Sequence, residues 1–185
     1  KDVTEIETLW HGLQPPYETL FEWLVAGGER PVLATPAIFH SVMLANAVEE
    51  GDLNGLDPAN YAAEWKWDGI RVQLSRSGDR RKIYSRSGDD ISVAFPDILD
   101  AISFSGVVDG ELLVGGTARS NSPTRTFSDL QQRLNRKTVT ARMLSDYPAF
   151  IRTYDLLFDG DEDVRGDGFT DRRDRLAEII DRAPH

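Results

Sequence analysis

The stretch YAAEWKWDGIRVQL, residues 61–74, decides the fold class because its side chains alternate in character with a period of two. Glu64, Lys66 and Asp68 share one side of an extended chain, and Trp65 and Trp67 share the other. After the glycine at position 69, apolar and polar residues continue to alternate up to residue 75. The pattern predicts a β-strand over residues 61–74.

A turn signal at Ser77-Gly78-Asp79 follows, and residues 82–86 run back as a second strand, which makes a hairpin. Apolar runs predict two more strands over residues 107–114 and 150–158. Helical spacing predicts helices over 93–104, 126–134, 138–145 and 171–182, the last capped by Thr170 with Asp171 in its first turn. The sum is an α+β domain with a largely antiparallel sheet and flanking helices.

The N-terminal residues differ from this domain. Apolar residues at helical spacing predict helices over residues 3–13 and 17–26, which Pro15-Pro16 separates and Gly27-Gly28 closes. An extended linker follows, and we place a domain boundary near residue 32. The expected organisation is a short helical unit over residues 1–32 and a sheet domain over residues 33–185.

Composition excludes several classes of function. With no cysteine, the chain has no disulfide, no thiol nucleophile and no thiolate zinc site. Its three histidines are scattered, no apolar run is long enough to cross a bilayer, and nothing at the N-terminus resembles a signal peptide. We therefore expect a cytoplasmic protein with no membrane partner. The sequence leaves the oligomeric state open, and a monomer is the expectation.

The net charge of −10 argues against a nucleic-acid partner, but this charge is unevenly distributed along the chain. Residues 117–145 carry six basic residues against the single acid Asp129, so this segment is strongly basic on an acidic body. A solvated charged surface gives the same pattern. The alternative is a site for a nucleic-acid backbone, for which the candidate residues are Arg119, Arg125, Arg133, Arg136 and Lys137.

Lys66 is the strongest candidate for chemistry. A mid-strand lysine between two tryptophans gains little as a generic surface residue, and as the free amine it is a nucleophile. Gly69 removes a side chain just beyond it, which allows a tight turn or the close approach of a ligand. Arg71 can then donate two hydrogen bonds to a phosphate or a ribose. An exposed lysine paired with Glu64 and Asp68 is the structural alternative.

Four segments, in order, resemble the motifs of the covalent nucleotidyltransferases, which include DNA ligases, RNA ligases and mRNA-capping guanylyltransferases. Residues 66–71, KWDGIR, resemble motif I, Lys-x-Asp-Gly-x-Arg. Residues 85–88 (SRSG) resemble motif Ia, 108–112 (VDGEL) motif III, and 152–157 (RTYDLL) motif IIIa, which FDG continues as in DNA ligases. The likeness is greatest to bacterial ATP-dependent DNA ligases with an N-terminal helical DNA-binding domain, of which residues 1–32 would be the end.

The resemblance implies an adenylation (nucleotidyltransferase, ATP-grasp-like) domain that uses ATP and Mg²⁺ and acts on nicked double-stranded DNA in repair, replication or recombination. Lys66 would attack the α-phosphate of ATP and carry AMP as a covalent intermediate. Glu64 would lie beside the adenine, on which Tyr154 would stack. Arg71 would contact the ribose side and Arg86 a phosphate, and Glu111 would bind the ribose hydroxyls or the metal.

The chain departs from the family near its end. Motif V, with lysines for the α-phosphate, is not recognisable, because no lysine follows Tyr154. Motif IV, with a metal-binding Glu, is not recognisable either, because neither Glu162 nor Glu178 stands in a Glu-Gly-apolar context. We therefore expect an incomplete adenylation domain that is nearly inactive in isolation. An RNA ligase or capping enzyme would share the lysine motif, and a non-catalytic DNA-binding module is the third alternative.

Overall fold

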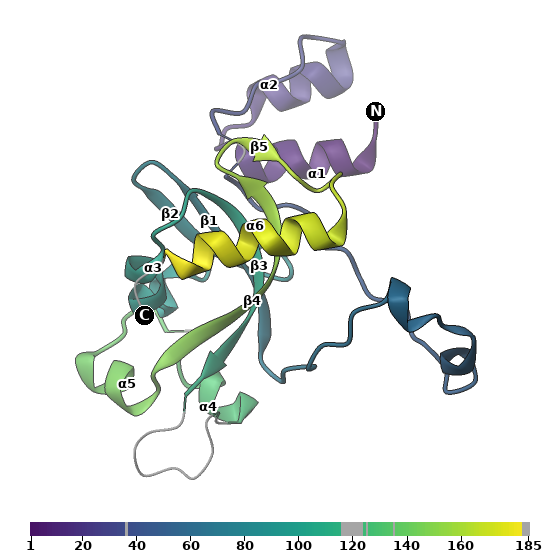
Figure 1. Ribbon diagram of the computed structural model, residues 1–185. Coiled ribbons are helices and arrows are strands. Elements are labelled where there is room, and N and C mark those ends of the chain that lie inside the picture. The colour runs from purple at the N-terminus through teal and green to yellow at the C-terminus, as the bar shows by residue number, and fades with distance from the viewer. Residues whose placement is uncertain (36, 116–123, 125, 135, 183–185) are drawn as a thin grey trace.

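A five-stranded antiparallel sheet, with strand order β2-β1-β3-β4-β5, forms the centre of the molecule (Figure 1). The computed structural model describes residues 1–35, 37–115, 124, 126–134 and 136–182. The predicted α+β class with a largely antiparallel sheet is confirmed. The strands are β1 (Ile70–Ser77), β2 (Arg80–Ser85), β3 (Gly106–Val114), β4 (Ala149–Asp159) and β5 (Glu162–Asp163).

The apolar side chains of the strands pack under helices. Val72 of β1 and Leu112 of β3 belong to the main core, together with Phe95, Ile98 of α3 (Pro96–Ala101) and Leu130 of α4 (Phe127–Gln131). A second cluster forms where α6 (Phe169–Asp181) packs on β4 (Figure 1). Because side chains alternate along a strand, the polar residues between these apolar ones point to the opposite side of the sheet.

Strand register lines up these polar residues in rows. Arg71 pairs with Glu111, which pairs with Arg152, so one row crosses β1, β3 and β4. On β3, Asp109 pairs with Asp155 and the next residue pairs with Thr153, so the residue between them on β4 is an extra one. That residue is Tyr154. The bulge therefore sets the direction of the tyrosine.

The N-terminal unit has a small core of its own. It consists of α1 (Val3–Gly12), α2 (Glu18–Phe21) and a π-helical turn η1 (Glu22–Ala26), and Leu9, Leu20 and Trp23 are buried among them. Gly27, in the left-handed conformation, ends this unit, which agrees with the predicted helical hairpin. Contact with the sheet domain runs through His11, whose ring lies 4.7 Å from that of Phe39. The division at residue 32 stays a prediction.

The linker then follows strand β1. The buried side chain of Gln73 accepts a hydrogen bond from the His40 amide (2.9 Å) and donates one to the His40 carbonyl (2.7 Å). Beyond the linker, the short 3₁₀ turns η2 (Asp52–Gly55) and η3 (Pro58–Asn60) lie in an arm that stands away from the sheet (Figure 1, blue).

The strand predicted over residues 61–74 is wrong in its first half, since β1 begins at Ile70. No described strand pairs with residues 61–69, and Trp65 is 85% exposed. Alternation identifies an extended chain, but a strand also needs a hydrogen-bonded partner.

Three predicted helices are shorter than expected. The one predicted over residues 93–104 divides into η4 (Ser92–Ala94) and α3, because Pro96 lacks an amide hydrogen and restricts Phe95 before it. The helices predicted over 126–134 and 138–145 are α4 and α5 (Ala141–Asp146). Helix α6 has Gly168 at its N-cap, so Thr170 does not cap it, although Asp171 lies in its first turn as predicted. Among the described residues, no helix is long and apolar enough to cross a membrane.

Candidate nucleotide site

A cleft of about 840 Å³ lies between residues 64–67 and the polar side of the sheet. Its lining includes every residue that the motifs single out for a nucleotide: Glu64, Lys66, Arg71, Arg86, Glu111 and Tyr154. They come from the segment before β1, from β1, from the turn after β2, from β3 and from β4. The structure thus brings together all six residues, while the individual role of each stays a prediction.

Gly69 fixes the lysine segment to β3. Its amide donates a hydrogen bond to the Glu111 carboxylate (3.1 Å). A Cβ at this position would lie 2.3 Å from the Leu112 carbonyl oxygen, closer than any real contact. The missing side chain therefore admits the backbone of β3, where the sequence had suggested a turn or a ligand.

Glu111 lies close enough to Lys66 for their charges to interact. Burial raises the pKa of its carboxyl group, and the Gly69 amide and the charges of Lys66 and Arg71 oppose that rise. No cluster of three or more potential metal ligands exists in the part of the chain that the structure describes. Glu111, with one oxygen accepting from Gly69, has its other oxygen available as a single protein ligand to a metal. That number suits Mg²⁺, which often takes one or two carboxylates and fills the remaining positions with water and phosphate oxygens.

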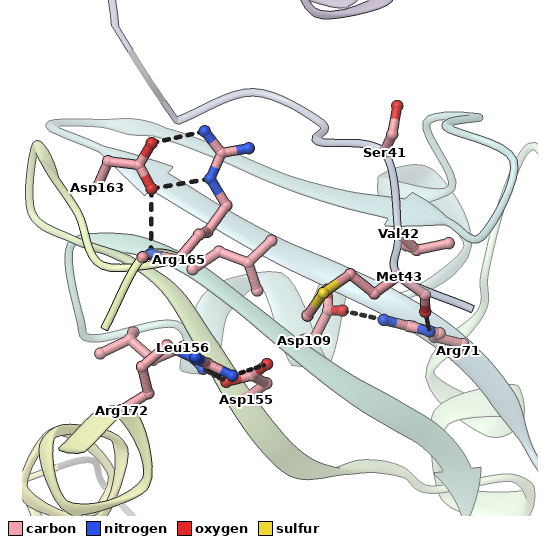
Figure 2. A pocket seen from close by; sticks show the side chains of 12 residues that line it. Ser41, Val42, Met43, Arg71, Asp109, Asp155, Leu156, Asp163, Arg165 and Arg172 are labelled. Atoms are coloured by element: carbon pink, nitrogen blue, oxygen red, sulfur yellow. Dashed lines mark hydrogen bonds and ion pairs between the residues drawn. The ribbon is translucent and has the colours of Figure 1, made fainter. Parts of the chain in front are cut away.

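Arg71 is held from two sides at the edge of the cleft. One guanidinium nitrogen donates to the Met43 carbonyl (2.6 Å) and another pairs with Asp109 (2.5 Å), as Figure 2 shows. Asp109 is buried, and burial raises its pKa, an effect that the ion pair with Arg71 opposes. The arginine is therefore already oriented without a ligand.

A second pocket, of about 360 Å³, lies behind Arg71 (Figure 2). All of its charged residues are matched in pairs. Arg71 pairs with Asp109, Arg165 with Asp163, and Arg172 with Asp155. The ion pairs around this pocket therefore strengthen the framework under the cleft.

Tyr154 forms the platform side of the cleft. Burial raises the pKa of its phenol above the ordinary value, so the ring is neutral. The Arg71 guanidinium lies 5.8 Å from the ring centroid. A neutral, half-buried ring that faces open space can stack on a base.

Sequence reasoning missed two arginines next to this platform. Arg152 lies over the Trp67 ring at 5.3 Å in an adjoining pocket that Tyr154 also lines. Its position two residues before Tyr154 was a signal that could have identified it. Arg173 of α6 contacts both Glu64 and Tyr154, and no local pattern pointed to it.

The candidate DNA residues fall into three groups. Arg119 and Arg125 lie outside the described residues. Arg136 and Lys137 are exposed, as a phosphate contact requires. The prediction for Arg133 is wrong, because its side chain is 0% exposed and its guanidinium pairs with Asp97 at 2.5 Å. A buried, paired arginine cannot reach a DNA backbone.

The cleft gathers a lysine, two carboxylates, two arginines and a tyrosine beside an antiparallel sheet, the residue types that the nucleotidyltransferase motifs predict. The family model for the ATP dependent DNA ligase domain matches residues 42–185, and the chain belongs to that family. The predicted family resemblance is confirmed.

Individual relatives agree. The chain is 34% identical over 140 residues to a probable DNA ligase of Koribacter versatilis, covering 73% of this chain and 24% of that protein. It is 30% identical over 179 residues to DNA ligase 1 of Korarchaeum cryptofilum, covering 91% of this chain and 31% of that protein. The chain thus spans about a quarter to a third of the length of these relatives.

Solved structures show the same fold. A mycobacterial DNA ligase D complexed with ATP and MES aligns with a TM-score of 0.50 and 26% identity, over 65% of this chain and 36% of that chain. The ligase domain from M. tuberculosis LigD aligns with the same TM-score and identity, and the match covers 65% of this chain and 37% of the LigD chain.

Proposed function

We propose that this chain is the nucleotide-binding part of an ATP-dependent DNA ligase that seals nicks in double-stranded DNA through a lysyl-AMP intermediate. The observation that carries the proposal is the assembly of Glu64, Lys66, Arg71, Arg86, Glu111 and Tyr154 around one cleft. Membership of the ligase domain family supports the same reaction.

In the proposed reaction, the free amine of Lys66 attacks the α-phosphorus of ATP. A phosphorus–nitrogen bond forms, the bond to the bridging oxygen breaks, and pyrophosphate leaves with the electron pair while the amine loses a proton. AMP then passes to the 5′-phosphate of the nick, and a 3′-hydroxyl displaces it. Phosphoryl transfer depends mainly on positioning and on neutralising charge. Arg86 can supply charge, and Arg71, which Asp109 already holds in place, can position the ribose side of the nucleotide.

Glu111 would hold Mg²⁺ together with phosphate oxygens of ATP, and the metal would neutralise charge on the reacting phosphate. Because Gly69 already donates to one oxygen of Glu111, the carboxylate is oriented toward the lysine segment. Tyr154 would support the adenine, and Glu64 would lie at its edge.

DNA is the proposed partner, and Arg136 and Lys137 are the proposed backbone contacts among the described residues. Replacing both with glutamate should reduce the slope of log affinity against log salt by about 0.9 for each lost contact. We further propose that residues 1–32 end a helical DNA-binding domain, and that the protein is a cytoplasmic monomer.

The test is adduct formation in the full-length protein with α-labelled ATP and Mg²⁺, followed by mapping of the labelled residue. Lys66→Ala should abolish the adduct. Lys82→Ala is the matched control, since Lys82 lies on β2 and pairs with Asp90 outside the cleft. An adduct that persists without Lys66, or label from GTP in preference to ATP, would overturn the proposal.

A further inference from the structure

One arginine joins the two sides of the nucleotide cleft. The Nη1 atom of Arg173, on α6, donates a hydrogen bond to the Tyr154 carbonyl (2.8 Å) and lies 3.0 Å from the Glu64 carboxylate. The ring of Phe169, one turn earlier on the helix, lies 5.8 Å from the same guanidinium. A single side chain thus contacts both elements between which the purine is proposed to lie.

Both of these elements need such a restraint. Glu64 belongs to residues 61–69, which pair with no described strand. Tyr154 is the extra residue of a bulge, so it has no direct partner on β3. Neither position is therefore fixed by regular sheet hydrogen bonds alone.

Helix α6 is itself well anchored, so Arg173 has a firm base. Its neighbour Arg172 donates to both oxygens of Asp155 (2.8 and 3.2 Å) and to the Asp167 carbonyl (2.7 Å). Leu176 is buried against β4. The helix consequently holds Arg173 against Glu64 and Tyr154 at a defined distance from the sheet.

We propose that Arg173 is a positioning residue that sets the spacing between the Glu64 segment and the Tyr154 ring, and so determines purine affinity and purine choice. The inference rests on the proposed function, because it assumes that ATP occupies this cleft. Arg173 does not line the cleft that contains Lys66, and its contacts are with Glu64 and Tyr154, so it acts through these two residues. Losing it should weaken nucleotide binding and leave the chemical step at saturating ATP nearly unchanged.

The experiment measures KM and kcat for adduct formation with ATP and with GTP in the full-length protein. Arg173→Gln should raise the KM for ATP about tenfold, equal to about 1.4 kcal/mol, and should lower the preference for ATP over GTP. Arg175→Gln is the matched control, because Arg175 lies on the same helix but pairs with Glu162 (2.9 Å), away from the cleft. It should leave both constants unchanged. Arg173→Lys should recover part of the affinity, since it keeps the charge.

Glu64→Gln removes the other partner of the same ion pair. Glu64 is exposed, so this substitution should leave the fold intact. Its effect on KM and that of Arg173→Gln should be less than additive. Three outcomes would each overturn the inference, provided that the wild type forms its adduct. They are equal KM values for Arg173→Gln and Arg175→Gln, a fall in kcat alone for Arg173→Gln, and full additivity of Arg173→Gln with Glu64→Gln. A wild-type protein without an adduct would overturn the proposed function and this inference together.

Discussion

Replacing Arg133 with methionine distinguishes two roles for this residue. The sequence predicted that Arg133 contacts DNA, whereas the structure buries it against Asp97. The guanidinium of Arg133 makes hydrogen bonds of 2.5 and 2.9 Å to Asp97 and further ones to the Ala94 and Tyr147 carbonyls. It also lies 4.7 Å from the ring centroid of Phe95. Arg133→Met keeps much of the apolar volume but leaves the carboxylate and both carbonyls without this donor.

The expected loss of stability follows from these contacts. Removing one partner of a buried ion pair costs about 3–5 kcal/mol. The Asp97 side chain is 29% exposed, so water can hydrate its carboxylate once the arginine is gone. We therefore expect a loss at the lower end of that range, about 3 kcal/mol. With a slope of about 2 kcal/mol per molar urea, the unfolding midpoint should fall by about 1.5 M.

The assay is urea unfolding, followed by tryptophan fluorescence, with Arg136→Met as the matched control. Arg136 is exposed and its described side-chain bond is to the Gln132 carbonyl in its own turn, so its loss should change stability by less than about 0.5 kcal/mol. DNA affinity, measured where both variants are folded, should fall for Arg136→Met and not for Arg133→Met. A stable Arg133→Met protein with weakened DNA binding would refute the reasoning and restore the prediction made from sequence.

Three further changes test the cleft. Tyr154→Ala should weaken ATP binding by about 1–3 kcal/mol in a titration, whereas the phenylalanine variant should bind nearly as well; equal small effects would mean that the ring only packs. Gly69→Ala places a Cβ 2.3 Å from the Leu112 carbonyl oxygen, so it should lower the free energy of unfolding by about 1–3 kcal/mol and slow adduct formation. Gly55→Ala is the control and should have neither effect, because no atom lies within 4 Å of its Cβ. Because burial raises the folded pKa of Glu111, its contribution to stability is present at low pH and is lost as the pH rises through that folded pKa. Glu111→Gln should therefore raise the melting temperature at pH 7 and lose this advantage below about pH 4, even though it impairs adduct formation; a lower melting temperature at pH 7 would contradict the assignment.

Much of the candidate site followed from sequence because its parts are short and local. Lys66 and Arg71 lie five positions apart in one extended segment, and Glu111 and Tyr154 belong to two apolar runs that predicted strands correctly. Residue order within such segments fixes which chemical groups a strand presents, and the order of the motifs along the chain pointed to a family that the comparisons confirm.

The remaining features depend on partners that are distant in sequence. Alternation over residues 61–74 could not show that the first half lacks a strand partner, and the composition of residues 117–145 could not show that Arg133 turns inward to Asp97, 36 residues earlier. The bulge that frees Tyr154 arises from the register between β3 and β4, and Arg173 reaches Glu64 only because α6 packs across β4. A charged side chain looks the same in sequence whether it faces water or an ion-pair partner. The sequence therefore determined which chemical groups the cleft contains. The tertiary structure decided which charged side chains are exposed for binding and which are buried in ion pairs that hold the cleft together, because packing between distant segments sets burial and pairing.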